Sequence, residues 1–220
     1  MPTTSNTPSP EPALPRSNRG RRFPAEVLSP AEIARLIDAC SRTAPTGLRN
    51  RALIVVMWRA GLRVSEALAL MPKDVDRASG TLHVLNGKGG KPRMVALDPP
   101  SFSVIERWLD ARNKLKRLTQ SPVFCTLHGL PIQTAYVRAL LPRLAESARI
   151  EKRVHAHALR HTFACELMRE KFPINLIQKQ LGHANLAVTS RYLQHVTPPE
   201  LAEAMQRRIL PSEVTQALDR

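Results

Sequence analysis

The sequence predicts a mainly α-helical domain that includes one small antiparallel β-sheet, an α+β fold. Two observations predict it. Apolar residues recur at helical spacing in several segments bounded by capping residues and prolines, and one pair of alternating segments flanks a glycine-rich turn. Hydrophobic residues make up 43% of the 220 residues, enough for the core of one or at most two domains. We expect the folded domain to span residues 25–210.

The two ends of the chain are predicted to lie outside this domain. Residues 1–24 hold six prolines, many serines and threonines, and four arginines, a composition typical of a disordered arm. These arginines either contact phosphate or only keep the arm soluble. Residues 211–220 form a short amphipathic tail.

The first helices are marked by capping residues, prolines and a glycine. Ser29, Pro30 and Glu32 make the capping-box pattern that starts a helix in SPAEIARLIDAC. The next segment, LRNRALIVVMWRAGL, is nearly all apolar and predicts a buried helix that breaks at Gly61. RVSEALAL then predicts a further helical turn, which Pro72 closes.

A β-hairpin is predicted in residues 81–98, TLHVLNGKGGKPRMVALD. Two runs in which apolar and polar residues alternate flank Gly-Lys-Gly-Gly, a pattern typical of two strands joined by a tight turn. The tip of this hairpin carries Lys88 and Lys91.

The C-terminal half is predicted to be mostly helical. Residues 101–118 are amphipathic, and residues 134–150 form another helix that is bent or interrupted at Pro142. Between residues 155 and 208 we expect at least three more helices, separated by Pro173, by Gly182 and by a Pro-Pro pair. The 101–118 helix places five apolar side chains on roughly one side: Val104, Ile105, Trp108, Leu109 and Leu115.

The chain is strongly basic, which indicates a polyanionic partner. Its 33 Lys and Arg against 18 Asp and Glu give a net charge of +15 at pH 7, so nucleic acid is the first partner to consider and anionic membrane the second. No apolar run has the length of a membrane span, and the N-terminus shows no signal peptide, so we expect a cytosolic protein. Three widely spaced cysteines are expected to be reduced and to fill space in the core: Cys40, Cys125 and Cys165.

One predicted helix, HALRHTFACELM, carries a cluster of cationic side chains. His157, Arg160 and His161 lie three and four positions apart, so they share one side of the helix. A guanidinium fork suits two phosphate oxygens, and imidazole exchanges protons near neutral pH. By itself the cluster is weak evidence for a site, and this segment alone is more typical of a solvated basic helix. A zinc site that includes His155 lacks a cysteine or carboxylate at ligand spacing. The core-facing stripe of the same helix is formed by Leu159, Phe163 and Leu167.

Three further segments carry a basic residue at the start of a helix, at the tip of a hairpin or at the end of a helix. Arg63 follows Gly-Leu at a helix start, and Glu66 either aims it for a function or only pairs with it on the surface. Lys88 lies at a glycine-flanked hairpin tip that is slim enough to enter a DNA groove, although exposed turn lysines are common. Gly182 is placed to cap a helix, and His183 follows it.

Four segments occur in an order that is known from one enzyme family. AGLRVSEALAL, NGKGGKPRMVAL, HALRHTFACELM and LGHANLAVTSRYLQHV resemble, in this order, the catalytic domain of the tyrosine recombinases, the phage-integrase and Xer-like family. The resemblance covers about residues 28–208. Each motif is moderately specific, and their order and separation make the match strong. It implies the tyrosine recombinase catalytic-domain fold and the activity of a site-specific DNA recombinase.

The resemblance also assigns roles to individual residues. The family's catalytic residues match six positions: Arg63, Lys88, His157, Arg160, His183 and Tyr192. By resemblance, Tyr192 is the nucleophile, the two arginines clamp the phosphate, and the lysine protonates the leaving 5′-oxygen. His157 assists proton transfer from the tyrosine, and His183 hydrogen-bonds the phosphate. Four more cations are expected to contact DNA: Lys91, Arg93, His161 and Arg191. The second tyrosine, Tyr136, matches no family position.

The implied reaction is DNA cleavage and rejoining through a 3′-phosphotyrosyl intermediate. One phosphodiester is exchanged for another ester of similar energy, so no ATP, metal or other cofactor is expected. The implied partners are double-stranded DNA, further copies of the chain in a homotetramer on two DNA sites, and an accessory recombinase or DNA-bending protein. In such a tetramer the tail of residues 211–220 docks on the neighbouring protomer. The expected location is the bacterial cytoplasm, at the nucleoid.

One departure from the family pattern concerns the N-terminus. Most relatives carry an N-terminal helical DNA-binding domain, where this sequence has only residues 1–24. Short relatives without that domain exist, the fimbrial phase-variation invertases among them. Two alternatives to a working recombinase therefore stay open: a non-catalytic or truncated DNA-binding relative of mobile-element origin, and a DNA-relaxing enzyme like the type IB topoisomerases. The complete catalytic set and the Gly-Leu-Arg and Leu-Gly-His contexts favour the recombinase.

Overall fold

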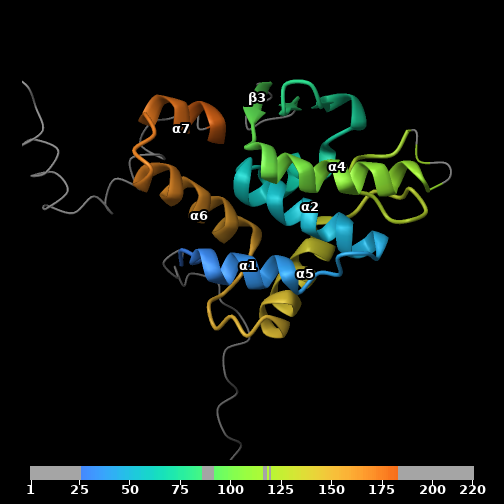
Figure 1. Ribbon diagram of the computed structural model, residues 1–220, viewed down its shortest axis with the longest axis horizontal. Coiled ribbons are helices and arrows are strands. Elements are labelled where there is room, and N and C mark those ends of the chain that lie inside the picture. The colour runs from blue at the N-terminus through green and yellow to red at the C-terminus, as the bar shows by residue number, and fades with distance from the viewer. Residues whose placement is uncertain (1–25, 86–91, 116–117, 119, 183–220) are drawn as a thin grey trace, which may run out of the picture.

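The computed structural model describes residues 26–85, 92–115, 118 and 120–182 (Figure 1). In these residues helices dominate and one small sheet is present, which confirms the predicted fold class. In chain order the elements are α1 (Pro30–Asp38), α2 (Pro45–Arg59), α3 (Val64–Ala69), the 3-10 helix η1 (Pro72–Asp74), β1 (Val75–Asp76), β2 (Thr81–Val84), β3 (Arg93–Ala96), α4 (Pro99–Asn113), α5 (Thr134–Ser147), α6 (Ala156–Arg169) and α7 (Ile174–Leu181). Among them, no helix is long and apolar enough to cross a membrane.

Helix α1 begins as the sequence predicts. The amide of Glu32 donates to Ser29 Oγ at 3.2 Å, and the amide of Ser29 donates to Glu32 Oε2 at 2.7 Å, which completes the capping box. Just before this cap, the amide of Leu28 donates to the hydroxyl of Thr162 in α6 at 3.0 Å, in a buried position. The segment that leads into α1 is therefore attached to the helix that carries the cationic cluster.

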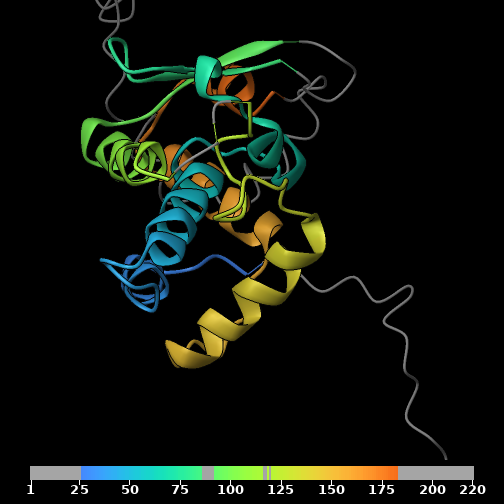
Figure 2. The same cartoon turned by 90° about the vertical axis from the view of Figure 1, so that its right-hand side faces the viewer.

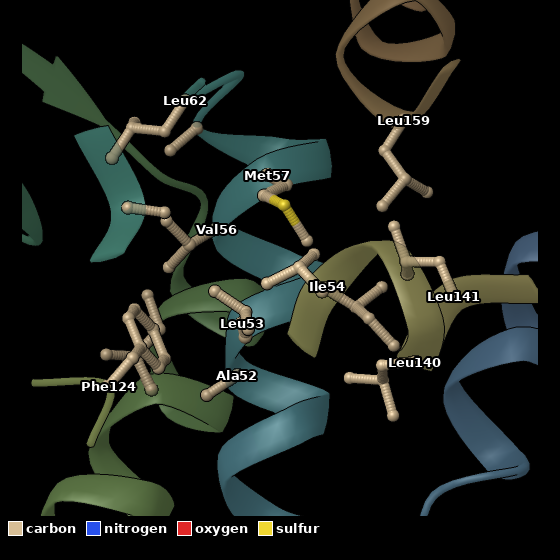
Figure 3. Close-up of a cluster of buried hydrophobic side chains, with 14 of the residues drawn as sticks. Ala52, Leu53, Ile54, Val56, Met57, Leu62, Phe124, Leu140, Leu141 and Leu159 are labelled. Carbon is tan, nitrogen blue, oxygen red and sulfur yellow. The ribbon is translucent and has the colours of Figure 1, made fainter. Parts of the chain in front are cut away.

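Helix α2 lies at the centre of the core. Every side chain from Ala52 to Met57 is buried, because α4 and α6 both pack against this helix. Figure 3 shows where side chains from other elements meet it, with Leu140 and Leu141 of α5 on one side and Phe124 on another. A helix that is covered on several sides needs apolar residues all round, and this confirms the prediction of a buried helix from a nearly all-apolar segment.

The sheet lies at one end of the molecule, and α5 lies at the opposite end (Figure 2). Its strands are antiparallel in the order β1-β2-β3, and β2 pairs with β3 from Thr81↔Ala96 to Val84↔Arg93. This confirms the predicted hairpin, although its tip, with Lys88 and Lys91, falls outside the described residues. Strand β1 was not predicted, because two residues are too few to show an alternating pattern.

Helices α4 and α5 follow the sequence pattern in part. Three of the five apolar residues predicted for one side of α4 are buried, Ile105, Trp108 and Leu109. Val104 and Leu115 are half-buried, and Leu115 lies beyond the end of the helix at Asn113. Helix α5 runs through Pro142 without the interruption that the sequence allowed for. Proline removes the hydrogen bond to the carbonyl of Arg138, four residues earlier. Both residues are exposed, so water can satisfy that carbonyl and the helix continues.

Helices α6 and α7 form where the sequence places them. The predicted core stripe of α6 is buried, at Leu159, Phe163 and Leu167. Helix α7 ends at Gly182, which adopts the left-handed conformation of a C-cap with φ of +63°. The helices expected after this point lie outside the described residues. The three cysteines are unpaired thiols in buried positions, as expected.

Candidate active site

Three arginines from three different elements converge on one buried carboxylate. The carboxylate belongs to Glu66 in α3, and its side chain is 2% exposed. Arg63 lies at the N-cap of α3, Arg93 is the first residue of β3, and Arg160 lies inside α6. The cluster therefore joins the first predicted catalytic arginine to the second, which is 97 positions away in the sequence.

The carboxylate of Glu66 is hydrogen-bonded through both oxygens. Oε1 accepts from Arg63 Nη1 at 2.7 Å and from Arg93 Nη1 at 3.0 Å. Oε2 accepts from the amide of Arg63 at 2.9 Å and from Arg93 Nη2 at 2.8 Å, and Arg160 Nη1 lies 4.0 Å from it. Burial raises the pKa of Glu66, but the hydrogen bonds from Arg93 and Arg63 outweigh burial and lower it to about 2. Three positive charges thus face one negative charge, and a positive field remains for an anion.

The arginines also bind the backbone at the ends of two neighbouring helices. Arg160 is 3% exposed, and it donates to the carbonyl of Gly61, after α2, and to the carbonyl of Leu181, in α7, at 2.5 Å. Arg63 Nη2 reaches the carbonyl of Gly182 at 3.4 Å. Carbonyls at a helix C-terminus carry partial negative charge, so cations are favourable there. The end of α7 is therefore fixed directly beside the cluster.

Gly61 is required where α2 turns into α3. It adopts φ of +63°, a conformation that L-residues rarely take. A Cβ atom at this position would lie 2.7 Å from Leu181 Cδ2 and 2.9 Å from Phe163 Cδ1. Only glycine lets the chain pass this close to both side chains while its carbonyl accepts the hydrogen bond from Arg160.

The structure divides the predicted cationic stripe of α6. Arg160 and His161 are buried, and His161 Nε2 lies 3.8 Å from Cys165 Sγ. His157 is exposed, and the centroid of its ring lies 6.4 Å from that of His155, the N-cap residue of α6. The alternative of a solvated basic helix is wrong for this segment, because a solvated face would not bury the guanidinium of Arg160.

The other predicted site residues differ in what the structure describes of them. Five predicted site residues lie outside the described part of the chain: Lys88, Lys91, His183, Arg191 and Tyr192. Arg93, predicted to contact DNA, has a side chain that is only 11% exposed and faces Glu66. Tyr136, which matches no family position, lies in a separate cluster where Arg49 donates to its hydroxyl at 2.6 Å.

Sequence reasoning missed the joint role of Glu66 and Arg93. The sequence indicated that Glu66 either aims Arg63 or pairs with it on the surface, but it showed no link from Glu66 to Arg93, and no local pattern shows that a carboxylate is buried. The available signal was the strand pattern of β3, in which Arg93 stands two residues before the buried Val95 and so on the same side of the strand.

Among the described residues, Glu66 lines a small cavity of about 150 Å³ beside η1 and β2, and none of the three clustered arginines lines that cavity. A cavity of about 730 Å³ opens nearby, between α5 and residues 150–156, and it is lined mainly by apolar side chains such as Val137, Ile150 and Val154. None of the three clustered arginines lines it. Arg63 is the most exposed member of the cluster, at 29%, so an anion can approach the cluster from the side of Arg63.

Comparison with known proteins decides the family. The family described as the phage integrase family matches residues 26–197. This chain belongs to the phage integrase family. The match includes every residue of the arginine cluster and all six positions that the sequence predicts to be catalytic.

Two curated relatives that match this chain are Xer recombinases. Tyrosine recombinase XerC of Halalkalibacterium halodurans is 34% identical over 196 residues, which are 86% of this chain and 64% of that protein. Tyrosine recombinase XerD of Ralstonia nicotianae is 36% identical over 169 residues, which are 76% of this chain and 55% of that protein. The chain thus spans less than two thirds of the length of these two relatives.

Solved structures of phage integrase relatives have the same fold. The crystal structure of XerA recombinase matches with a TM-score of 0.72 and 30% identity, over 87% of this chain and 68% of that chain. XerH recombinase bound to its difH substrate, in a pre-cleavage complex, gives 0.69 and 30%, over 85% and 55%. The catalytic domain of bacteriophage HP1 integrase gives 0.56 and 26%, over 83% and 94%. The predicted tyrosine recombinase catalytic-domain fold is confirmed.

Replacing Gly61 with alanine should destabilise the fold more than the same change at Gly80. Both glycines have positive φ, +63° and +65°, but a Cβ atom at Gly80 would have the carbonyl oxygen of Leu97 as its nearest neighbour, at 3.8 Å. Both variants should lose about 1–2 kcal/mol to backbone strain. Gly61→Ala should lose about 1–3 kcal/mol more, because its Cβ overlaps Leu181 and Phe163. Chemical denaturation measures the difference, and equal losses would contradict the crowding argument.

Glu66 should make the folded state sensitive to acid. Its pKa is lowered from 4.5 to about 2 by folding, so its stabilising effect is complete above pH 4.5 and declines as the pH falls toward 2. Between pH 6 and pH 3, wild type should lose about 2 kcal/mol of unfolding free energy that Glu66→Gln does not lose.

Urea unfolding at the two pH values measures this loss. Asp38→Asn is the control, because Asp38 pairs with Arg42 at an exposed site and should change the pH dependence little. If Glu66→Gln does not fold, an NMR titration of the Glu66 carboxyl in wild type reports its pKa directly. A pKa near 4.5 would refute the argument.

Proposed function

We propose that this protein is a site-specific DNA recombinase that cleaves and rejoins DNA strands through a 3′-phosphotyrosyl intermediate. The main support is that Arg63 and Arg160 converge beside the carboxylate of Glu66, whose single negative charge does not neutralise both arginines. The catalysis of phosphoryl transfer is largely positioning and electrostatic stabilisation, which such a cluster supplies. The similarity to Xer recombinases supports the same conclusion.

The two arginines have different parts in this proposal. The side chain of Arg63 is 29% exposed, and Nη1 is fixed on Glu66, so its guanidinium is held at the surface where a phosphate can approach. Arg160 is buried, where the dielectric constant is low and its charge acts more strongly on a nearby anion. Together they stabilise the charge that develops on the non-bridging oxygens in the pentavalent transition state.

The proposed covalent step uses residues beyond the described part of the chain. Tyr192 Oη attacks the phosphorus, the bond from phosphorus to the 5′-oxygen breaks, and the 3′-phosphate becomes an ester of the tyrosine. The phenol gives up its proton with the assistance of His157, and Lys88 protonates the leaving 5′-oxygen. His183, the residue after Gly182, hydrogen-bonds the phosphate. A 5′-hydroxyl then attacks the phosphotyrosine and releases Tyr192, so ester is exchanged for ester and neither ATP nor a metal is required.

The proposed partner is double-stranded DNA. The net charge of +15 favours a polyanion, and the XerH relative is described in complex with its difH substrate. We also propose a homotetramer on two DNA sites, assisted by an accessory recombinase or a DNA-bending protein, in the bacterial cytoplasm at the nucleoid. Lys91 and Arg191 are proposed to contact the DNA beside the site.

A covalent adduct with DNA tests the proposal. Wild-type protein, incubated with nicked duplexes selected for binding from a random-sequence pool, should form a denaturation-resistant adduct, and Tyr192→Phe should form none. The matched control is Tyr136→Phe, because these are the two tyrosines of the chain and Tyr136 has no proposed role. Absence of adduct from wild type on DNA that it binds would refute the catalytic function. Recombinant products, scored against relaxed circles, distinguish recombination from the topoisomerase alternative.

The tail of residues 211–220 is proposed to dock on a neighbouring protomer. Deleting it should abolish the assembly of two DNA duplexes in one complex, as measured by native electrophoresis, while adduct formation on single duplexes continues. Unchanged assembly would remove this role. Loss of both activities would indicate that the tail is needed for the fold of its own protomer.

A further inference from the structure

We propose that Arg93 is a positioning residue of this site, which fixes the Glu66 carboxylate and the last turn of α7 and so keeps the two phosphate-binding arginines in place. The inference rests on the proposed strand-cleavage function and adds a residue to it. In this role Arg93 acts from inside the protein and needs no contact with DNA.

Strand β3 directs Arg93 into the protein. Alternate residues of a strand point to opposite faces, and Arg93 shares its face with Val95, which is fully buried, while the intervening Met94 is 58% exposed. The side chain of Arg93 is 11% exposed. All three nitrogens of its guanidinium donate to acceptors inside the protein, the Glu66 carboxylate and the carbonyl of Gln180, and this favours a role inside the protein.

The pairing of Arg93 with Glu66 depends on the shape of the guanidinium. Nη1 donates to Oε1 at 3.0 Å and Nη2 donates to Oε2 at 2.8 Å, the parallel two-bond geometry of a guanidinium on a carboxylate. Two parallel bonds fix the plane of the carboxylate, whereas the single ammonium of a lysine would leave it free to rotate. The plane of Glu66 in turn determines where Arg63 is held, because both oxygens also accept from that residue.

The same guanidinium holds the last turn of α7. Arg93 Nε donates to the carbonyl of Gln180 at 3.3 Å. The carboxamide of Gln180 pairs with the backbone of Ala96 on β3, donating to its carbonyl at 2.8 Å and accepting from its amide at 3.3 Å. A Cβ atom at Gly182 would lie 2.8 Å from Arg93 Cδ and Nε, so the helix end and the arginine fit together only because that residue is glycine. Figure 1 shows α7 beside β3.

Both effects act on the proposed phosphate-binding arginines. The carbonyl of Leu181 accepts from Arg160 and that of Gly182 accepts from Arg63, so a shift of this turn moves the anchors of both. Loss of Arg93 would also leave Glu66 with fewer hydrogen bonds. Its Oε2 lies 4.0 Å from Arg160 Nη1, so a small rotation would form a closer pair and draw the positive charge away from the phosphate.

Single-turnover adduct formation on nicked DNA tests this proposal, with the rate at saturating DNA measured separately from the dissociation constant. Arg93→Ala should cleave about 10- to 100-fold more slowly at saturation, the usual effect of misplaced catalytic groups, and bind DNA within about threefold of wild type. Arg93→Lys keeps the charge but loses the two-bond geometry, so it should recover little of the rate.

The matched control is Arg59→Ala. Arg59 also joins separate elements, since it binds Asp98 at 2.9 Å and Glu166 at 3.3 Å, and neither carboxylate belongs to the Glu66 cluster. This variant should lose stability and still cleave at the wild-type rate under conditions where it is folded. If it slows as much as Arg93→Ala, the effect is general destabilisation and the proposal is overturned.

Two other outcomes decide between the inference and the function on which it rests. A wild-type rate at saturation in Arg93→Ala, with weakened binding, would make Arg93 a DNA contact and overturn the positioning role alone. No adduct from wild type would overturn the proposed function as well. If Arg93→Ala fails to fold, Gln180→Ala replaces it, because it removes the two hydrogen bonds from the Gln180 carboxamide to Ala96 and loosens the turn that Arg93 holds. It should slow cleavage at saturation, and an unchanged rate would count against the proposal.

Discussion

Burying an unpaired carboxylate as deeply as that of Glu66 would reduce the free energy of unfolding by several kcal/mol. Much of the arrangement around the site follows from the hydrogen bonds that offset this loss. The hydrogen bonds that do so come from the N-cap of α3 and from β3, and a further guanidinium approaches from α6. These elements are far apart in the sequence. Glu66 is therefore a structural centre that no single segment could complete.

The hydrogen bonds to Glu66 also reduce the repulsion among the three arginines. Three guanidiniums this close together repel one another, and a site that must attract phosphate cannot neutralise all of them. One carboxylate and the carbonyl groups at the end of α7 hold the cations in place and leave positive charge in excess. Because these groups are already ordered in the protein alone, little reorganisation is needed when an anion arrives.

Much of the fold could be predicted from local patterns, because those patterns report local physics. The capping box at Ser29, the all-apolar segment of α2 and the glycine that ends α7 each determine a nearby hydrogen bond or a buried face, and each is found in the structure. The two-residue strand β1 escaped prediction, and the sequence left open whether Pro142 interrupts α5, since pairing partners and solvent exposure are tertiary properties.

The site, like the fold, could be predicted only where local motifs indicate it. Arg63 and Arg160 could be named from their motifs, but their meeting at Glu66 depends on contacts across 97 positions of the sequence. Arg93 shows the limit most clearly. A surface role follows from its charge and from its neighbours near the hairpin tip, whereas its inward direction follows from the pleat of β3 and from a carboxylate that only the fold brings near.

The end of α7 is also a fixed attachment point for the residues that follow it in the sequence. Gly182 is held by its carbonyl to Arg63, and Tyr192 is the tenth residue after it. Ten residues span at most about 35 Å, so this length limits how far the Cα atom of Tyr192 can lie from a point that is locked to the arginine cluster. A tether of this length confers an effective concentration on the order of millimolar. For a tyrosine proposed to act at the arginine cluster of its own chain, the approach of the phenol is therefore intramolecular, whereas the proposed binding of DNA and assembly with other copies depend on concentration.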